Sequence, residues 1–101
     1  MDKINIEDFQ RKVEQEPNMN IIDVRPDRLY NAGHVPGAMH MPLDTIEDNL
    51  DQLNKDTHYY TYCHDGVGAA KSAEILEQNG FNVTRVEQGL PEYTGQLETA
   101  E

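Results

Sequence analysis

Residues 58–76 read HYYTYCHDGVGAAKSAEIL, and the change of pattern inside this stretch decides the fold. The first five residues are of types that favour β-strands. Gly66 and Gly68 follow in a short loop, where glycine allows the backbone to turn tightly. Beyond the loop, small and apolar residues recur at helical spacing as far as Leu76. The stretch therefore predicts a strand, a glycine-rich loop and a helix in direct succession.

Strand and helix patterns alternate in the same way along the rest of the chain. Further helices are expected at residues 6–13, 27–32 and 43–53, and further strands at residues 19–24, 38–41 and 83–86. Asn5 and Asp8 form an N-cap pattern, and Gly80 with Phe81 is typical of a Schellman-type helix ending. The alternation predicts an α/β fold, with a small parallel sheet flanked by helices on both faces. Residues from Gly95 onward are polar and are expected to fray.

The size and charge of the chain narrow its class. Its 101 residues fit a single domain over residues 1–101, with a core at about residues 4–94. The 19 acidic residues outnumber the 8 basic ones and give a net charge of -11, so neither nucleic acid nor an anionic membrane is an expected partner. No apolar run approaches the roughly 20 residues that cross a bilayer, and the start lacks a signal-peptide pattern. A soluble, cytoplasmic protein is therefore expected.

Cys63 is the one cysteine of the chain, and it follows a predicted strand. Sites in parallel sheets form beyond the C-terminal ends of the strands. Inward-turned N–H groups of the loop and the positive end of the next helix favour an anion there: a thiolate, a persulfide or a substrate oxyanion. A nucleophilic cysteine is one interpretation, and a buried, inert cysteine is the other. A single cysteine excludes an intrachain disulfide, and the spacing of the four histidines indicates no metal site.

The chain resembles a single rhodanese-like (sulfurtransferase) domain over nearly its full length, and three stretches carry the resemblance. Residues 22–25 and 33–42, IDVR and GHVPGAMHMP, are similar to the family pattern DVR…GHIPGAINIP. The second stretch is the Cys63 loop with Gly66 and the helix that follows. The third is VEQGLPEY at residues 86–93, which is similar to the ending VEGGLxxW.

The resemblance implies that Cys63 is the nucleophile and the sulfur carrier. The cysteine would take a sulfane sulfur from a donor, thiosulfate or a persulfide, and pass it to a thiol or cyanide in a second half-reaction. Donor and acceptor are expected to be small molecules or proteins, with no cofactor and no metal; the oligomeric state stays open. The substrate-binding residues implied in this way are Arg25, His64, Asp65, Gly66, Val67, Gly68 and Ala69.

The active loop departs from the family pattern CxxGxRS at its last two positions. Gly68 and Ala69 stand where the family has arginine and serine, so the loop lacks a cationic clamp for an anionic donor. Asp65 adds a negative charge that opposes both a thiolate and thiosulfate, whereas His64 and Lys71 are the cations that could offset it. Phosphatase and arsenate reductase activities are not expected, and a persulfide is favoured over thiosulfate as the donor. The alternative is a non-catalytic binding or regulatory module.

Two further polar residues, Arg25 and His34, each have a functional and a structural interpretation. Arg25 could add positive potential to the site, but for Asp23 and Arg25 a structural ion pair or a hydrogen-bond anchor for the loops around them is favoured. His34, in the turn Gly-His-Val-Pro-Gly, is interpreted as a hydrogen-bonded turn residue rather than a catalytic base.

Overall fold

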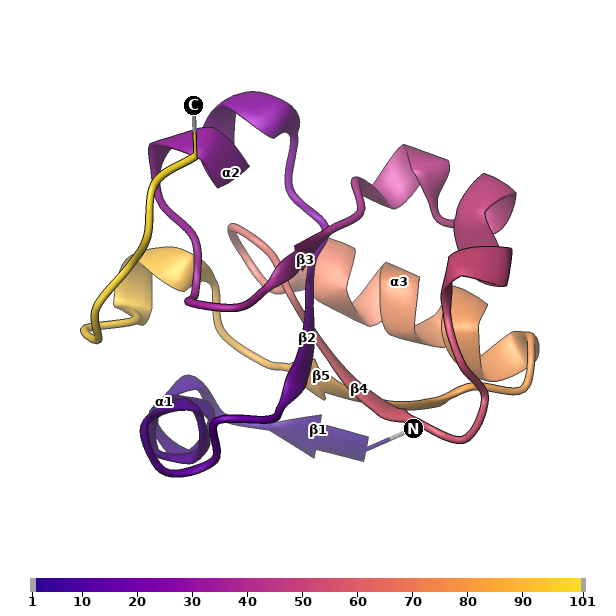
Figure 1. Cartoon of the computed structure of the whole chain (residues 1–101), viewed down its shortest axis with the longest axis horizontal. Helices are drawn as coiled ribbons and strands as arrows, with labels where there is room; N and C mark the ends of the chain where they lie inside the picture. Colours follow the sequence, from indigo (N-terminus) through magenta and orange to yellow (C-terminus); the bar gives the residue numbers. More distant parts are fainter. Residues whose placement is uncertain (1, 101) are drawn as a thin grey trace.

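Five parallel strands form one sheet in the computed structural model, which describes residues 2–100 (Figure 1). The strands are β1 (Asp2–Ile4), β2 (Asn20–Asp23), β3 (Met39–His40), β4 (His58–Tyr62) and β5 (Asn82–Val86), in the order β1-β5-β4-β2-β3. The predicted parallel sheet and its four predicted strands are confirmed. β1 was not predicted, because three largely exposed residues carry no pattern. Its pairing with β5, with Asp2 beside Thr84, sets its register.

Helices cover both faces of the sheet, as expected (Figure 1). The α-helices are α1 (Ile6–Gln15), α2 (Asp27–Ala32) and α3 (Val67–Gln78). The 3-10 helices are η1 (Leu43–Thr45), η2 (Glu47–Gln52) and η3 (Leu90–Glu92). α1 and η3 pack on one face of the sheet, and α3 packs on the other face together with η1 and η2.

The single helix expected at residues 43–53 is wrong, because the segment forms two short 3-10 helices. Asn49 interrupts η2 with non-helical angles of φ -125° and ψ 18°. Its side-chain amide donates to the carbonyl of Thr45 at 2.8 Å, and the Thr45 hydroxyl donates to the carbonyl of Pro42 at 2.7 Å. Such side-chain bonds compete with the backbone bonds of an α-helix. The apolar spacing nevertheless reflects burial in the core, since Ile46 is fully buried.

The predicted ends of the two long helices are confirmed. The Asn5 side chain accepts a hydrogen bond from the N–H of Asp8 at 2.8 Å and caps α1. At the end of α3, Gly80 takes a φ of +87°, which glycine adopts without strain. The N–H of Phe81 then donates to the carbonyl of Leu76 at 3.0 Å, as a Schellman motif requires.

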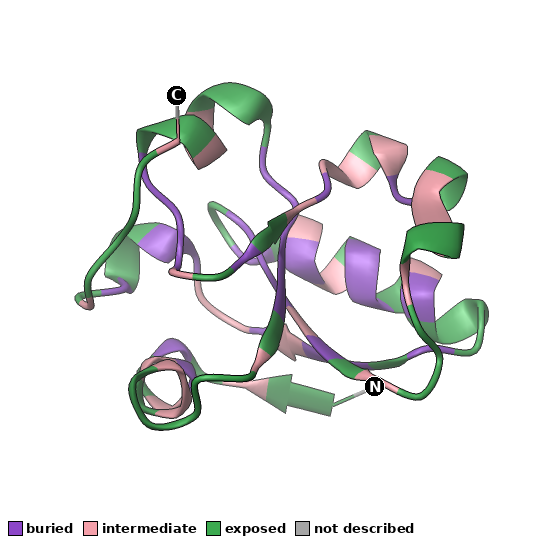
Figure 2. Cartoon of the chain, viewed as in Figure 1, coloured by how far each residue is buried: buried purple, intermediate pink, exposed green. Residues whose placement is uncertain are grey.

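The core consists of two apolar clusters, one on each face of the sheet. β2 contributes to both, because successive side chains of a strand point to opposite faces. Ile22 packs with Leu76 on the α3 side, and Ile21 packs with Phe9 on the α1 side. Figure 2 shows the consequence, an inner strand that is buried along most of its length. The C-terminal end of this strand is therefore held rigidly from both sides.

The C-terminal segment was expected to fray, but Glu98 and Ala100 are hydrogen-bonded to the backbone of α2 and of the turn that follows it. Glu98 and His34 exchange two backbone hydrogen bonds of 2.8 and 2.9 Å. The N–H of Ala100 donates to the carbonyl of Asn31 at 3.0 Å. These are main-chain bonds, which the polar side chains of the segment do not encode.

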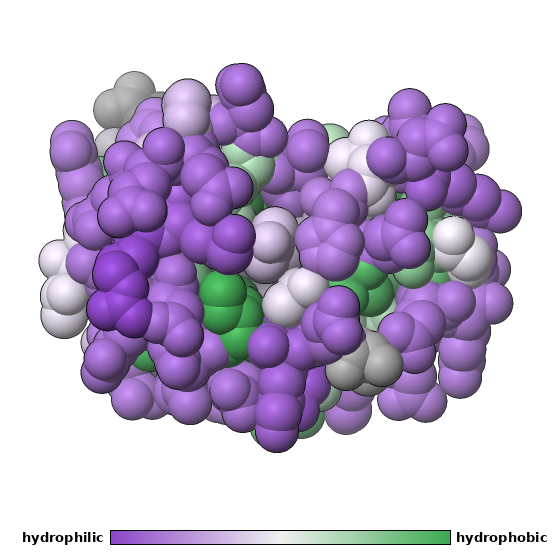
Figure 3. Space-filling model, turned by 90° about the horizontal axis from the view of Figure 1, so that it is seen from below, coloured by the Kyte–Doolittle hydropathy of each residue, from purple (hydrophilic) through white to green (hydrophobic). Residues whose placement is uncertain are grey.

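The surface reflects the acidic, polar composition. The face seen in Figure 3 is mostly hydrophilic, with small and separate hydrophobic patches. Within residues 2–100, no helix is long and apolar enough to span a membrane.

Candidate active site

Cys63 lies just after β4, in the loop that leads into α3. Its side chain is 4% exposed, and its Sγ atom accepts hydrogen bonds from the N–H groups of Gly66 at 3.0 Å and Ala69 at 3.1 Å. Of the loop N–H groups expected near the sulfur, these two reach it. Two N–H donors and the positive end of α3 favour negative charge on this sulfur.

Two glycines let the loop lie against the turn after β5. Gly66 has a φ of +90°, and a Cβ there would stand 2.3 Å from the carbonyl oxygen of Glu87. A Cβ on Gly89 would stand 1.7 Å from the carbonyl oxygen of His64. No role was predicted for Gly89 itself, although it lies within the family-like stretch at residues 86–93. Both positions therefore require glycine for the loop to keep its shape.

A cavity of about 620 Å³ opens onto the cysteine. Its walls come from residues 24–27 after β2, residues 42–45 at η1, and residues 63–65 with Gly68 of the loop. The structure thus brings four of the predicted substrate residues to one cavity, and these are Arg25, His64, Asp65 and Gly68. Gly66 and Ala69 are the hydrogen-bond donors of the sulfur and are not among the cavity walls, and Val67 is exposed at the start of α3.

Asp65 is the acidic residue that is hydrogen-bonded to the sulfur of Cys63. Its Oδ1 atom lies 3.7 Å from the Sγ of Cys63 and accepts a hydrogen bond of 3.0 Å from the N–H of Val67. The carboxylate therefore caps the first turn of α3 while its charge opposes a thiolate. Because Asp65 is exposed, water and salt weaken that opposition. The backbone donors and this carboxylate act on the sulfur in opposite directions.

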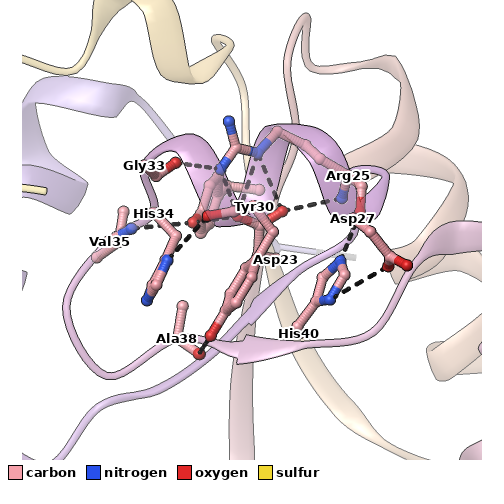
Figure 4. A network of polar contacts seen from close by, with 10 residues as sticks. Asp23, Arg25, Asp27, Tyr30, Gly33, His34, Val35, Ala38 and His40 are labelled. Carbon is pink, nitrogen blue, oxygen red and sulfur yellow. Dashed lines mark hydrogen bonds and ion pairs between the residues drawn. The ribbon is translucent and has the colours of Figure 1, made fainter. Parts of the chain in front are cut away.

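The guanidinium of Arg25 is engaged by a buried ion pair with Asp23 (Figure 4). It donates to Asp23 Oδ2 at 2.7 Å and to the carbonyl of Gly33 at 2.6 Å, and its side chain is 5% exposed. Burial opposes the charged form, but the hydrogen bonds and charge of Asp23 outweigh it and raise the pKa of Arg25. The favoured structural ion pair is present, and it joins the cavity wall to the turn after α2.

Tyr62 completes this network from β4. Burial and the charge of Asp23 raise the pKa of Tyr62 well above its ordinary value. The hydroxyl therefore keeps its proton, donates to Asp23 Oδ2 at 2.5 Å, and accepts from the N–H of Val35 at 3.0 Å. Since Tyr62 directly precedes Cys63, the network fixes the end of the strand that carries the cysteine.

The histidines of the turn regions have structural partners. His34 and His40 stack on the two sides of the Tyr30 ring, with centroids 3.9 and 4.2 Å apart from it (Figure 4). The Nδ1 of His34 lies 3.0 Å from the carbonyl of Tyr30, as expected for a turn residue, and the Nε2 of His40 donates to the carbonyl of Arg25 at 2.8 Å. In residues 2–100, no three or more histidine, cysteine or acidic side chains cluster as metal ligands would.

The two cations that could offset Asp65 differ in position. His64 is exposed at the edge of the cavity. Lys71 is exposed on α3 and does not belong to the cavity walls. Among the described residues, only His64 and the paired Arg25 bring basic groups to the cavity.

Comparison with known proteins shows the family of the chain. The family model of the rhodanese-like domain matches residues 5–96, so the chain belongs to the rhodanese-like domain family. A rhodanese-like domain protein from Staphylococcus aureus has the same fold, with a TM-score of 0.90 and 37% identity over 100% of both chains. The protein SSP1007 from Staphylococcus saprophyticus also gives a TM-score of 0.90 at 37% identity, over 97% of this chain and 99% of that one.

Two relatives from Bacillus subtilis (strain 168) have names that refer to sulfur. "Putative sulfur carrier protein YrkF" is 34% identical over 97 residues, which are 95% of this chain and 52% of that protein. "Putative sulfurtransferase YtwF" is 28% identical over 88 residues, which are 87% of this chain and 85% of that protein. The chain thus spans about half the length of the first relative and most of the second.

Proposed function

We propose that this chain carries a sulfane sulfur on Cys63 and transfers it from a donor to an acceptor. The observation that carries the proposal is the sulfur itself, held by two backbone N–H groups where the cavity reaches the end of β4. The names of the two Bacillus relatives support the same chemistry. A free thiol with this task requires a reducing compartment, so we place the protein in the cytoplasm.

In the first half-reaction, the Cys63 thiolate attacks the outer sulfur of a persulfide or thiosulfate donor. A new S–S bond forms on Cys63 while the old S–S bond breaks, and the electron pair of that bond leaves with the donor thiolate or with sulfite. The loop N–H groups that favour negative charge are in place to support the anionic persulfide. The chain needs no redox cofactor for this step, because the donor supplies sulfur at the required oxidation level.

In the second half-reaction, an acceptor thiolate or cyanide attacks the outer sulfur of the Cys63 persulfide. The S–S bond on the protein breaks, its electron pair returns to Cys63, and the thiolate is regenerated. Arg25 lies on the cavity wall in both steps, but its guanidinium is engaged with Asp23. We therefore favour a persulfide over thiosulfate as the donor, since thiosulfate depends more on a cationic clamp.

Intact-mass measurement after incubation with a persulfide donor, and separately with thiosulfate, tests the proposal. One added sulfur per chain is expected, with no addition in the Cys63→Ser variant, which also serves as the control for non-specific uptake. A chain whose reduced thiol is alkylated by iodoacetamide, yet takes sulfur from no donor, contradicts the proposal.

A non-catalytic binding module is the second candidate, and the carboxylate of Asp65 beside the sulfur favours it. The pH dependence of Cys63 alkylation separates the two functions. A sulfur carrier gives an alkylation rate that reaches its plateau below about pH 7, because the thiolate is already formed there. A rate that keeps rising through about pH 8.5, as for an ordinary thiol, supports the module.

A further inference from the structure

The cavity of Cys63 is lined by three exposed carboxylates from three different segments. Asp27 begins α2, Asp44 lies in η1, and Asp65 lies in the active loop. Residues 17 to 38 positions apart in sequence thus place negative charge around one opening, because their three segments line the same cavity.

The basic groups of the cavity do not balance these carboxylates. Arg25 forms a buried pair with Asp23, so the two charges cancel close to the cavity wall. His64 carries charge only when protonated, as does His40, whose Nδ1 lies 3.7 Å from Asp27 Oδ1. The one permanent cation among the described cavity residues is thus paired, and the opening is left with three exposed carboxylates.

A cavity lined by charges of one sign concentrates ions of the opposite sign and excludes ions of the same sign. From this charge distribution we infer that the site selects a sulfur donor or acceptor with a positive charge next to its sulfur. An amine-bearing small persulfide has this chemistry, and so does a partner cysteine flanked by lysine or arginine. The inference rests on the proposed sulfur-carrier function and names the substrate class of that site.

The walls of the cavity fit such a molecule. Val24, Pro42 and Leu43 provide apolar surface on the walls of the cavity. A short alkyl arm can lie along this surface while its ammonium group remains near Asp27 or Asp44 in water, where it loses little hydration. An anionic group of the same size would meet the same carboxylates at like charge.

Charged thiol reagents measure the selectivity without any sulfur transfer. The cationic aminoethyl and the anionic sulfonatoethyl methanethiosulfonates react with a thiolate in the same way: a disulfide forms and methanesulfinate leaves with the electron pair. The rate constants for Cys63 are measured at pH 8 and low salt, each divided by the rate constant with 2-mercaptoethanol. We expect the corrected cationic rate to exceed the anionic one by about tenfold or more, and the ratio to fall as salt is added.

Variants assign the selectivity to the cavity. Asp27→Asn combined with Asp44→Asn is expected to lower the cationic preference severalfold. Asp51→Asn, the same change at an exposed position outside the cavity, is the matched control and leaves the preference unchanged. Equal corrected rates for the two reagents, or a faster anionic reagent, would overturn the inference, as would an equal fall in Asp51→Asn.

Sulfur transfer provides the second arm. Cysteamine persulfide is expected to load Cys63 faster than thiosulfate does, and a Lys-Cys-Lys tripeptide to unload it faster than Glu-Cys-Glu. A preference among tripeptides points to a basic partner protein, and a preference confined to cysteamine persulfide points to a small molecule. Sulfur loading without any charge preference overturns the inference and leaves the proposed function intact. Charge-selective reagents on a cysteine that takes no sulfur overturn the proposed function instead.

Discussion

Asp23 is the last residue of β2 and Cys63 follows the neighbouring strand β4, yet the fold stabilises their charge by different means. The Asp23 carboxylate is fully buried; besides the backbone N–H of Arg25, it is bound by two side chains, the guanidinium of Arg25 and the hydroxyl of Tyr62. The sulfur of Cys63 accepts from the backbone N–H groups of Gly66 and Ala69. Side-chain partners neutralise a charge and fix it in place, whereas backbone donors favour an anion and leave the sulfur open to a substrate.

The difference also explains why the guanidinium on the cavity wall is not free to bind a substrate. Arg25 is close enough to line the cavity, but Asp23 and the carbonyl of Gly33 use its donors. Breaking the pair would leave a buried carboxylate without its cation and strongly destabilise the protein, so Arg25 stays bound to Asp23. The guanidinium therefore stabilises the fold around the site, and the charge of the opening is left to exposed carboxylates.

Arg25→Met should have the largest effect, because it leaves Asp23 buried without a cation. The free energy of unfolding is expected to fall by about 3–5 kcal/mol, measured by urea denaturation. Lys71→Met, which removes an exposed cation, is the control and should change stability by less than about 0.5 kcal/mol. Adding Asp23→Asn to Arg25→Met should restore part of the loss. A loss for Arg25→Met no larger than for Lys71→Met would contradict the structural role of the pair.

Tyr62→Phe tests the other partner of Asp23 and should have the next largest effect. The change leaves one carboxylate oxygen and the N–H of Val35 with a lost partner, and a loss of about 1–3 kcal/mol is expected. Tyr60→Phe is the matched control, because the Tyr60 hydroxyl interacts with Lys12 at a half-buried position. Thermal unfolding of both variants gives the comparison. Equal losses would mean that the Tyr62 hydroxyl does not support Asp23.

Gly68→Arg adds a guanidinium to the active loop, whereas the guanidinium of Arg25 is paired with Asp23. Thiosulfate loading of Cys63 is expected to become about tenfold faster, because a cation next to the sulfur attracts the dianion. A Cβ at Gly68 would lie 3.3 Å from the Cβ of Cys63, a close contact that the loop must absorb. Gly68→Ala therefore controls for the methyl group alone. Unchanged loading in a folded Gly68→Arg protein would show that loop charge does not limit the reaction.

Asp65→Asn should have the smallest effect. The substitution removes a charge 3.7 Å from the sulfur, while the amide oxygen can still accept from the N–H of Val67. Alkylation of Cys63 by neutral iodoacetamide at pH 7 is expected to be about two to five times faster, since solvent screens the interaction. Asp56→Asn gives the matched control at another exposed aspartate. A slower reaction in Asp65→Asn would show instead that the carboxylate accepts the thiol proton.

Local patterns predicted the parts of the fold that local interactions stabilise. The strand His58–Tyr62 and the helix 27–32 have the bounds expected, and the Asn5 cap is present. The single helix predicted at residues 43–53 was wrong because side-chain hydrogen bonds of Asn49 and its neighbours compete with the backbone bonds of an α-helix. Apolar spacing records burial, and that burial is satisfied equally by two 3-10 helices.

The same division holds for the site. The sequence located Cys63 in a glycine-rich loop and identified the Asp23–Arg25 pair, because both depend on residues a few positions apart. The close approach of Gly89 to the loop was not predictable, since it depends on a turn more than 20 residues away. The joining of Asp27 and Asp44 to the cavity was missed for the same reason.

The sequence by itself determined an α/β chain with a parallel sheet, a cysteine loop and a family-like motif set. Periodicity and turn chemistry are local properties, so they can be recognised in the sequence alone. Only the tertiary structure decided which loop N–H groups reach the sulfur, where the guanidinium of Arg25 is engaged, and how three distant carboxylates surround one opening. Those features arise when separate strand ends meet at one edge of the sheet, and no local pattern records that meeting.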